Sequence, residues 1–260
     1  MANAAEEKLP LTVAIIALNA GRLIGPCLAS VDSFAGEILV VDSGSTDDTV
    51  EIARRHGARV ETKEWLGFGR QKQYAVSIAR HDWVLCLDTD ERVSEKLVAS
   101  IRAAFAGRGY KAYRVARRNR FLGKWLGHGE GYPDWTLRLF HRTSASWSND
   151  EVHEAVLTTA EVGRLDGDLM HDSAEDVATY IAKQNRYTTL HAESLFKQGV
   201  RASAWRLLAS PLARFVKFFF LRLGFLDGGP GLAHIVIGCH STFLKYLKLI
   251  ELQRNRGATP

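Results

Sequence analysis

Two aspartates one residue apart follow a short apolar run in the stretch VLCLDTDERVS. Asp88 and Asp90 carry like charges that repel at close range unless a positive group lies between them. Carboxylate oxygens are the preferred ligands of hard divalent cations such as Mg²⁺ and Mn²⁺. Acids at the start of a helix also suit its dipole, so a solvated turn is the alternative interpretation.

The elements around this pair alternate between strand and helix. Apolar runs predict strands at 11–18, 37–41, 58–62 and 83–87, and helices are expected at 23–31, 47–56, 71–79 and 94–105. Ser45 and Asp48 have the spacing of a capping box, and Gly57 suits a helix C-terminus. This order predicts an α/β fold with a mostly parallel central sheet and flanking helices.

Ligands bind beyond the carboxyl ends of the strands in such sheets. Asn19, Asp42 and Asp88 each follow the end of an expected strand, so we place them at one edge. A basic loop, GRQKQ, with Arg70 and Lys72, lies between the third and fourth strands. The combination favours a site for an anionic ligand and a cation over a solvated turn.

The pattern changes after Tyr110. KAYRVARRNRFLG and WTLRLFHR are typical of antiparallel strands, and an aromatic, glycine-rich connection joins them. Ser173 and Asp176 predict the start of a long helix that ends near Gln198. The rest of the chain is expected to be helical, with a break at LDGGPG.

Two other acid- or glycine-based sites do not match. Aspartyl phosphatases carry D-x-D-x-T after the first strand, whereas this pair follows the fourth strand and Arg92 replaces the threonine. A dinucleotide site needs G-x-G-x-x-G after the first strand, and the turn here reads NAGRLIG.

Composition sets the broad class. The chain has 260 residues, of which 46% are hydrophobic and 24% charged, as in globular proteins. Its three cysteines form no CxxC pair, which favours a reducing compartment. We expect no signal peptide, and no apolar run reaches the roughly 18 residues of a spanning helix.

The C-terminal region is basic. Residues Phe196 to Pro260 include ten Lys or Arg residues and only two acids. In PLARFVKFFFLRLGFL, large apolar residues surround Arg214, Lys217 and Arg222, a pattern that suits an amphipathic helix on an anionic membrane surface. A helix packed on the α/β domain is the alternative. We expect no nucleic acid partner, because no recognition motif is present.

The motifs in order resemble a known family. VAIIALNAGRLIGPCLASV, ILVVDSGSTDDTVEIA and VLCLDTDE are similar to the inverting family-2 glycosyltransferases with the GT-A fold. WTLRLFHR, NDEVHEAV, LMHDSAEDVATYIAKQNRYT and FLDGGPGL resemble a narrower group, the bacterial lipopolysaccharide core glucosyltransferases. The first match covers roughly residues 11–105 and the second most of the chain.

This resemblance implies a UDP-sugar donor and a divalent metal, Mg²⁺ or Mn²⁺. By position, Asn19 and Asp42 would hold the nucleoside, Lys72 or Arg70 would reach the base or a phosphate, and Asp88 and Asp90 would bind the metal. Asp88 would thus contact both donor and ion. Many members read DDGSTD where this chain reads DSGSTD, so the uracil contact stays open.

An inverting transfer needs a base for the acceptor hydroxyl. The resemblance favours Glu154 in NDEVHEAV, with Asp150 or Glu151 as the alternatives. A neutral imidazole can complete a metal shell, and some GT-A enzymes place a histidine there, so His171 is a third candidate metal ligand.

The resulting prediction is a GT-A domain at 1–195 and a basic, helical extension at 196–260. The enzyme would move a hexose, with glucose favoured, from a UDP-sugar to a lipopolysaccharide inner-core sugar. It would work in the cytoplasm, peripherally on the inner face of the bacterial inner membrane. The alternatives are another cell-envelope glycosyltransferase, a metal-dependent nucleotidyltransferase, or a membrane-surface adaptor without catalysis.

Overall fold

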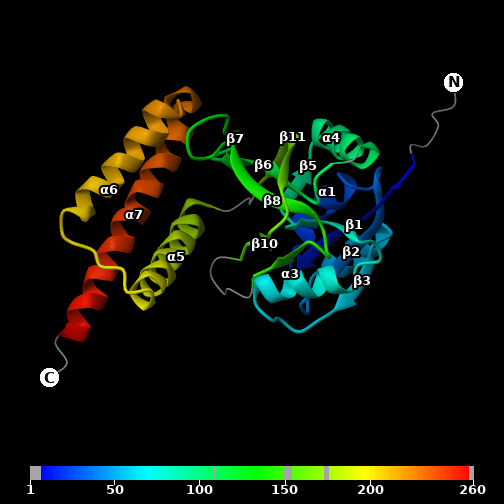
Figure 1. Ribbon diagram of the computed structural model, residues 1–260, viewed down its shortest axis with the longest axis horizontal. Coiled ribbons are helices and arrows are strands. Elements are labelled where there is room, and N and C mark those ends of the chain that lie inside the picture. The colour runs from blue at the N-terminus through cyan, green and yellow to red at the C-terminus, as the bar shows by residue number, and fades with distance from the viewer. Residues whose placement is uncertain (1–6, 108, 149–153, 173–175, 258–260) are drawn as a thin grey trace. The chain divides into compact units, whose positions relative to one another are not determined.

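The computed structural model describes residues 7–107, 109–148, 154–172 and 176–257. Its chain divides into two compact units (Figure 1). The first contains residues 1–117 and 135–173, and the second contains residues 118–134 and 174–260.

The first unit begins with a parallel half-sheet in the order β3-β2-β1-β4. Its strands are β1 (Leu9–Ala17), β2 (Ala35–Asp42), β3 (Arg59–Thr62) and β4 (Trp83–Leu87). The helices between them are α1 (Gly21–Ala29), α2 (Thr49–Arg55) and α3 (Phe68–Ser77). Because the strands are parallel, their carboxyl ends meet at one edge, and that edge carries Asp42 and Asp88.

Both faces of this half-sheet are covered, which explains why its strands are continuous apolar runs. Leu11, Val13 and Ile15 of β1 point to one face and pack with α1, α2 and α4 (Glu95–Ala106). The alternate residues Ala14 and Ile16 point to the other face, where α3 packs.

The sheet continues beyond β4 as β8-β6-β11-β5, and β8 and β5 pair antiparallel with β4 and β11. The strands are β5 (Glu91–Val93), β6 (Ala112–Phe121), β8 (Asp134–His141) and β11 (Val162–His171). Short β7 (Lys124–Trp125) pairs with β6, and β9 (Ala145–Trp147) with β10 (Val156–Thr158). The predicted α/β class is confirmed, with a sheet that is parallel from β3 to β4 and that contains the antiparallel pairs β4–β8 and β11–β5 beyond it.

Two local expectations were wrong. Ser45 does not cap α2; its hydroxyl instead donates to Asp42 and accepts from the Asn19 backbone N–H. The serine hydroxyl is thus engaged by Asp42. At the start of α2, the Asp47 carboxylate instead accepts from the Thr49 N–H at 3.1 Å. The basic stretch GRQKQ lies on α3, which begins at Phe68, and is not a loop.

Ser94 caps α4 as predicted and also ties it to β11. Its Oγ accepts from the Leu97 N–H at 3.3 Å and from the Asp168 N–H at 3.0 Å. Ser94→Ala leaves two backbone donors without this acceptor, so we expect a loss of about 1–2 kcal/mol in the free energy of unfolding. Urea titration checks this. Ser77→Ala, at an exposed hydroxyl that donates to the Tyr74 carbonyl, is the control and should change stability by less than about 0.5 kcal/mol.

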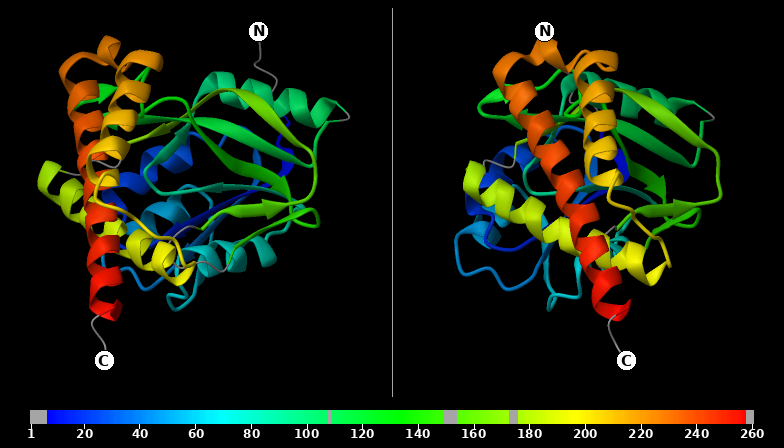
Figure 2. Two further views of the ribbon diagram at one scale, coloured as in Figure 1. Left: turned by 60° about the vertical axis from the view of Figure 1, so that its left-hand side comes forward. Right: turned by 90° about the vertical axis from the view of Figure 1, so that its left-hand side faces the viewer.

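The second unit is mainly helical. It contains α5 (Val177–Lys197), α6 (Arg206–Phe215), the π-helical turn η1 (Val216–Leu221), the 3₁₀ turn η2 (Gly224–Asp227) and α7 (Gly228–Gly257). α5 and α6 both pack along α7 (Figure 2). Asp227 accepts from the Gly127 and His128 N–H groups, which joins the segment of residues 118–134 to η2 within this unit.

The helical character predicted for the C-terminal region is present. Asp176 caps α5, with its carboxylate accepting from the Thr179 N–H at 2.8 Å, whereas Ser173 lies outside the described residues. The predicted division at 195/196 falls near the end of α5, while the compact units separate at 173/174. That division stays a prediction. Within the described residues, every helix is too short or too polar to cross a membrane.

Candidate active site

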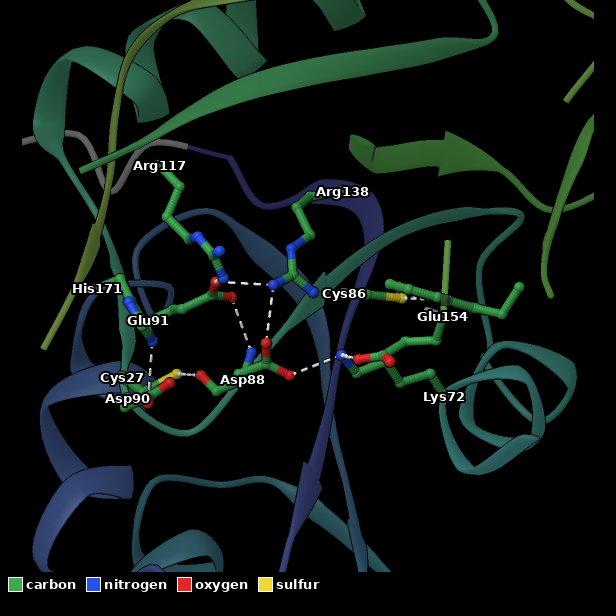
Figure 3. Close-up of polar contacts among 11 residues, drawn as sticks. Cys27, Lys72, Cys86, Asp88, Asp90, Glu91, Arg117, Arg138, Glu154 and His171 are labelled. Carbon is green, nitrogen blue, oxygen red and sulfur yellow. Dashed lines mark hydrogen bonds and ion pairs between the residues drawn. The ribbon is translucent and has the colours of Figure 1, made fainter. Parts of the chain in front are cut away.

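Asp88 lies at the carboxyl end of β4 between two cationic side chains (Figure 3). Lys72 Nζ, from α3, is 2.9 Å from its Oδ1, and Arg138 Nη2, from β8, is 2.8 Å from its Oδ2. Both cationic side chains are almost fully buried, at 5% and 4% exposed, whereas Asp88 is 30% exposed. The carboxylate is therefore held in one orientation and left partly accessible.

Glu91 fixes the turn that presents the two aspartates. Its Oε2 accepts from the Asp88 N–H at 2.9 Å, and its Oε1 accepts from Arg138 Nη2 at 2.8 Å. Arg117 Nη1 lies 3.7 Å from the same carboxylate, which is fully buried. The buried Glu91 carboxylate, itself paired with two arginines, thus holds the turn in place.

The charges at this edge shift the pKa values of Asp88 and Glu91 in opposite directions. Burial opposes ionisation of Asp88, but the charges of Lys72 and Arg138 outweigh it and hold its pKa well below the ordinary value. Burial, together with the charge of Asp88, raises the pKa of Glu91. Asp88 and Glu91 share Arg138 as a partner. The pKa of Asp88 is lowered and that of Glu91 is raised, so Asp88 is the stronger acid of the two.

Arg138 is the cation that both buried acids need. Arg138→Met leaves Glu91 with Arg117, at 3.7 Å, as its cationic neighbour and removes one partner of Asp88. Breaking a buried ion pair in this way costs about 3–5 kcal/mol of unfolding free energy. Arg55→Met breaks an exposed pair with Glu51, whose side chains are 63% and 73% exposed, so it should cost no more than about 1 kcal/mol. Urea titrations of the two variants compare these losses, and equal losses would show that Arg138 carries no structural charge role.

Asp90 lies beside His171. The His171 Nε2 is 3.2 Å from Asp90 Oδ2, and the two side chains are 23% and 20% exposed. Strand pairing sets this distance, because His171 of β11 is in register with Glu91 of β5, and the Asp172 N–H donates to the Asp90 carbonyl at 3.0 Å. Burial raises the pKa of Asp90, but the hydrogen bond and charge of His171 outweigh this and lower it.

This pair has the chemistry of a partial metal site. Within the described ranges, no group of three or more His, Cys, Asp or Glu side chains is placed to hold an ion by itself. One carboxylate and one imidazole, both accessible, suit an ion that takes its other ligands from water and from a phosphorylated substrate, as Mg²⁺ commonly does. The residues therefore fit a divalent ion shared with a ligand.

Glu154 reaches the same edge from the segment before β10. Its Oε1 is 3.5 Å from Lys72 Nζ, so Lys72 lies between Glu154 and Asp88 (Figure 3). Gly69 allows α3 to approach this segment, because a Cβ there would be 2.3 Å from the Ser148 carbonyl oxygen. The ring of Trp147 lies under the ammonium of Lys72 at 4.8 Å. Asp150 and Glu151 lie outside the described residues.

The turns after β1 and β2 bind one another. The Asn19 side-chain oxygen accepts from the Thr46 N–H at 2.9 Å, and the Asn19 N–H donates to Ser45 Oγ at 2.8 Å. Asp42, only 3% exposed, accepts from the Gly44 and Ser45 N–H groups, each at 2.9 Å. Asn19 and Asp42 thus shape the adjoining turns, and their contact with a nucleoside stays a prediction.

The structure brings most of the predicted residues together at one edge. Lys72, Asp88 and Glu154 form a chain of ionic contacts, and Asp90 pairs with His171. Arg70 is exposed on α3. Residues two apart on a helix point to different sides, so Arg70 and Lys72 lie on different faces of α3.

Sequence reasoning missed three residues of the site. Arg138 and Glu91 carry the charge network, and Gln71, fully buried, donates from Nε2 to Ser43 Oγ at 3.1 Å and to the Lys63 carbonyl at 3.2 Å. Glu91 follows the aspartate pair directly, and Arg138 is a charge within an apolar strand pattern, WTLRLFHR. Glu91 and Arg138 are thus charged residues in buried sequence surroundings, where a charge needs a partner.

Comparison with known proteins identifies the class. The sequence model of glycosyl transferase family 2 matches residues 12–160. A glycosyltransferase of Rickettsia typhi, itself uncharacterized, is 34% identical over 92% of this chain and 86% of its own length. The lipopolysaccharide core biosynthesis glycosyltransferase LpsC of Rhizobium meliloti is 29% identical over 94% of this chain and 93% of its own length.

Among solved structures, residues 1–349 of Staphylococcus aureus TarS in complex with UDP-GlcNAc align with a TM-score of 0.48 at 12% identity. That alignment covers 95% of this chain and 92% of the other. The family match and the curated relatives are sufficient to place the protein: this chain belongs to glycosyltransferase family 2 and is a glycosyltransferase.

Proposed function

We propose that the protein is an inverting, metal-dependent glycosyltransferase that transfers a hexose, with glucose favoured, from a UDP-sugar to a lipopolysaccharide inner-core sugar. The observation that carries the proposal is the set of acidic and cationic groups converging beyond β4: the Asp90–His171 pair beside the Glu154–Lys72–Asp88 chain. The similarity to LpsC supports the acceptor class.

The donor would lie along the carboxyl edge of the parallel strands, where α/β folds bind nucleotides. Asn19 and Asp42 order the turns that would receive the nucleoside. Lys72 supplies a positive charge 2.9 Å from Asp88, close to the position expected for the diphosphate. Asp88, held ionised and 30% exposed, is available to accept a hydrogen bond from the ribose or the sugar.

Asp90 and His171 are the residues that would hold a divalent ion, with Mg²⁺ and Mn²⁺ both compatible with a carboxylate and an imidazole. Both oxygens of Asp88 already face Lys72 and Arg138, so we expect Asp90 to be the stronger ligand of the two aspartates. When bound, such an ion neutralises the charge on a leaving diphosphate.

The reaction would be a single displacement at the anomeric carbon. The acceptor oxygen forms a bond to that carbon, the bond to the diphosphate oxygen breaks, and its electron pair leaves with UDP. Glu154 would take the proton of the acceptor hydroxyl, because its carboxylate is 25% exposed and lies at the edge that carries Asp88. Asp150 and Glu151 remain the alternative bases.

The acceptor suggests where the enzyme works. Inner-core sugars are attached to a lipid, so we propose that the protein acts on the cytoplasmic face of the bacterial inner membrane and contacts an anionic lipid surface. The basic balance of residues 196–260 supports this partner.

A donor screen tests the function. Purified protein is mixed with Mn²⁺ or Mg²⁺, a lipopolysaccharide acceptor truncated in the inner core, and one nucleotide sugar at a time, and released nucleoside diphosphate is measured. The proposal predicts UDP release with UDP-glucose that depends on the acceptor. Release of pyrophosphate from a nucleoside triphosphate and a sugar phosphate would instead identify a nucleotidyltransferase.

A further inference from the structure

One face of α6 and η1 exposes a continuous row of large apolar side chains. Their exposed fractions range from 41% for Val216 to 76% for Leu208, although leucine and aromatic side chains are usually covered. The row, which we call the apolar stripe, consists of Trp205, Leu208, Leu212, Val216 and Phe220.

The backbone keeps this stripe straight. Four residues make slightly more than one turn of an α-helix, so a spacing of four drifts around α6. The π-helical turns of η1 contain more residues, so the same spacing makes slightly less than one turn there and the drift reverses. The change from α to π geometry at Val216 therefore keeps Phe220 on the same face as Leu212.

The opposite side of the same segment packs within the helical unit. Arg214 forms an ion pair with Glu130 and donates to Thr242 Oγ1 at 3.0 Å. Gly238 of α7 makes room for this pair, because a Cβ there would be 2.5 Å from the Glu130 carboxylate. α6 is thus fixed to α7 (Figure 2). The side chains of the apolar stripe are exposed.

This arrangement corrects the sequence-based picture of the segment. Arg214 and Arg222 were expected at the polar edge of a membrane helix, yet Arg214 pairs with Glu130, and Arg222 Nη2 donates to the carbonyls of Tyr132 and Pro133. Of the three basic residues expected there, Lys217 is the exposed one. It lies next to Val216 of the stripe.

The charge around the stripe selects its partner. The sequence holds no Asp or Glu from residue 196 to residue 226, and Arg201 and Lys217 are exposed near its two ends. A second copy of this chain would bring the same positive charges together, which is unfavourable. An anionic lipid surface offers both an apolar interior for the stripe and negative headgroups for the basic residues.

We propose that the apolar stripe inserts into the headgroup boundary of an anionic membrane, with α6 and η1 lying parallel to the surface. Arg201 and Lys217 then contact lipid phosphates. The membrane as a partner rests on the proposed function, whereas the inserting face rests on the exposure of these five side chains and on the charge around them.

Vesicle co-sedimentation of the full chain tests this surface. Vesicles of phosphatidylglycerol and phosphatidylethanolamine should bind the protein, raised salt should weaken binding, and phosphatidylcholine vesicles should bind it much less. Leu212→Glu, which places a charge in the middle of the stripe, should weaken binding to anionic vesicles by roughly tenfold or more. Leu157→Glu is the matched control, because Leu157 is 57% exposed on β10 of the other unit and should leave binding unchanged.

UDP titration of the same samples separates this proposal from the proposed function. Leu212→Glu should keep the wild-type affinity for UDP, which also shows that the variant is folded. Wild-type protein that stays in the supernatant with anionic vesicles would overturn the surface, as would equal binding by Leu212→Glu. A concentration-dependent dimer that Leu212→Glu abolishes would assign the stripe to self-association instead.

Discussion

Glu154→Gln should reduce the turnover number of sugar transfer by about 10²–10⁴ and leave the affinity for UDP within about threefold of wild type. The amide has nearly the same shape, and its oxygen can still accept a hydrogen bond from Lys72, which lies 3.5 Å from Glu154 Oε1. The amide cannot take a proton from the acceptor hydroxyl, so the loss should fall on the chemical step. Kinetics of UDP release and calorimetric titration of UDP separate the two effects.

A control variant and two contrary outcomes complete the test of Glu154 as the base. Glu161→Gln removes an exposed carboxylate from the same part of the chain and should transfer sugar at the wild-type rate. Full activity of Glu154→Gln would transfer the role of base to Asp150 or Glu151, which the same assay can examine. Loss of UDP affinity would show instead that Glu154 supports the donor site through Lys72.

The second large effect is expected at Asp90. Asp90→Asn should remove the gain in UDP affinity that Mn²⁺ provides, a loss of at least about tenfold, and should lower turnover by about 10²–10³. The physical reason is that the amide is neutral, so it binds a divalent ion weakly and leaves the charge on the departing diphosphate uncompensated. Titrations of UDP with and without Mn²⁺ measure the first effect.

Asp82→Asn provides the matched control. Asp82 directly precedes β4, whereas Asp90 follows it, and its side chain is 55% exposed in an ion pair with Arg142. The variant should keep the Mn²⁺-dependent gain in UDP affinity. His171→Ala should reproduce most of the Asp90→Asn phenotype, because the two side chains are 3.2 Å apart and would share the ion. A wild-type response to Mn²⁺ in Asp90→Asn would remove this residue from the metal site.

Local patterns were sufficient for the parallel half of the fold. The strand predicted at 83–87 has the observed bounds of β4, because its apolar run is bounded by charged residues on each side. Ser94 was identified as a cap because a cap depends on residues three apart. The position of the aspartate pair at the sheet edge therefore follows from local sequence patterns alone.

Long-range charge pairs could not be predicted in this way. Arg138 meets Asp88 and Glu91 across 50 and 47 residues, and the pairing depends on β8 lying next to β4 in the sheet. The contact between Lys72 and Glu154 spans 82 residues. The capping box at Ser45 failed for a related reason, because Asp42 and Asn19 hold the serine hydroxyl instead.

The most direct test of the central claim is a crystal structure of the protein with UDP and Mn²⁺, with data collected for the anomalous signal of manganese. The account predicts an anomalous peak bonded to Asp90 and His171 and to the phosphates of UDP, with the nucleoside near Asn19 and Asp42. A peak remote from Asp90 and His171, or UDP bound away from the carboxyl end of β4, would contradict it.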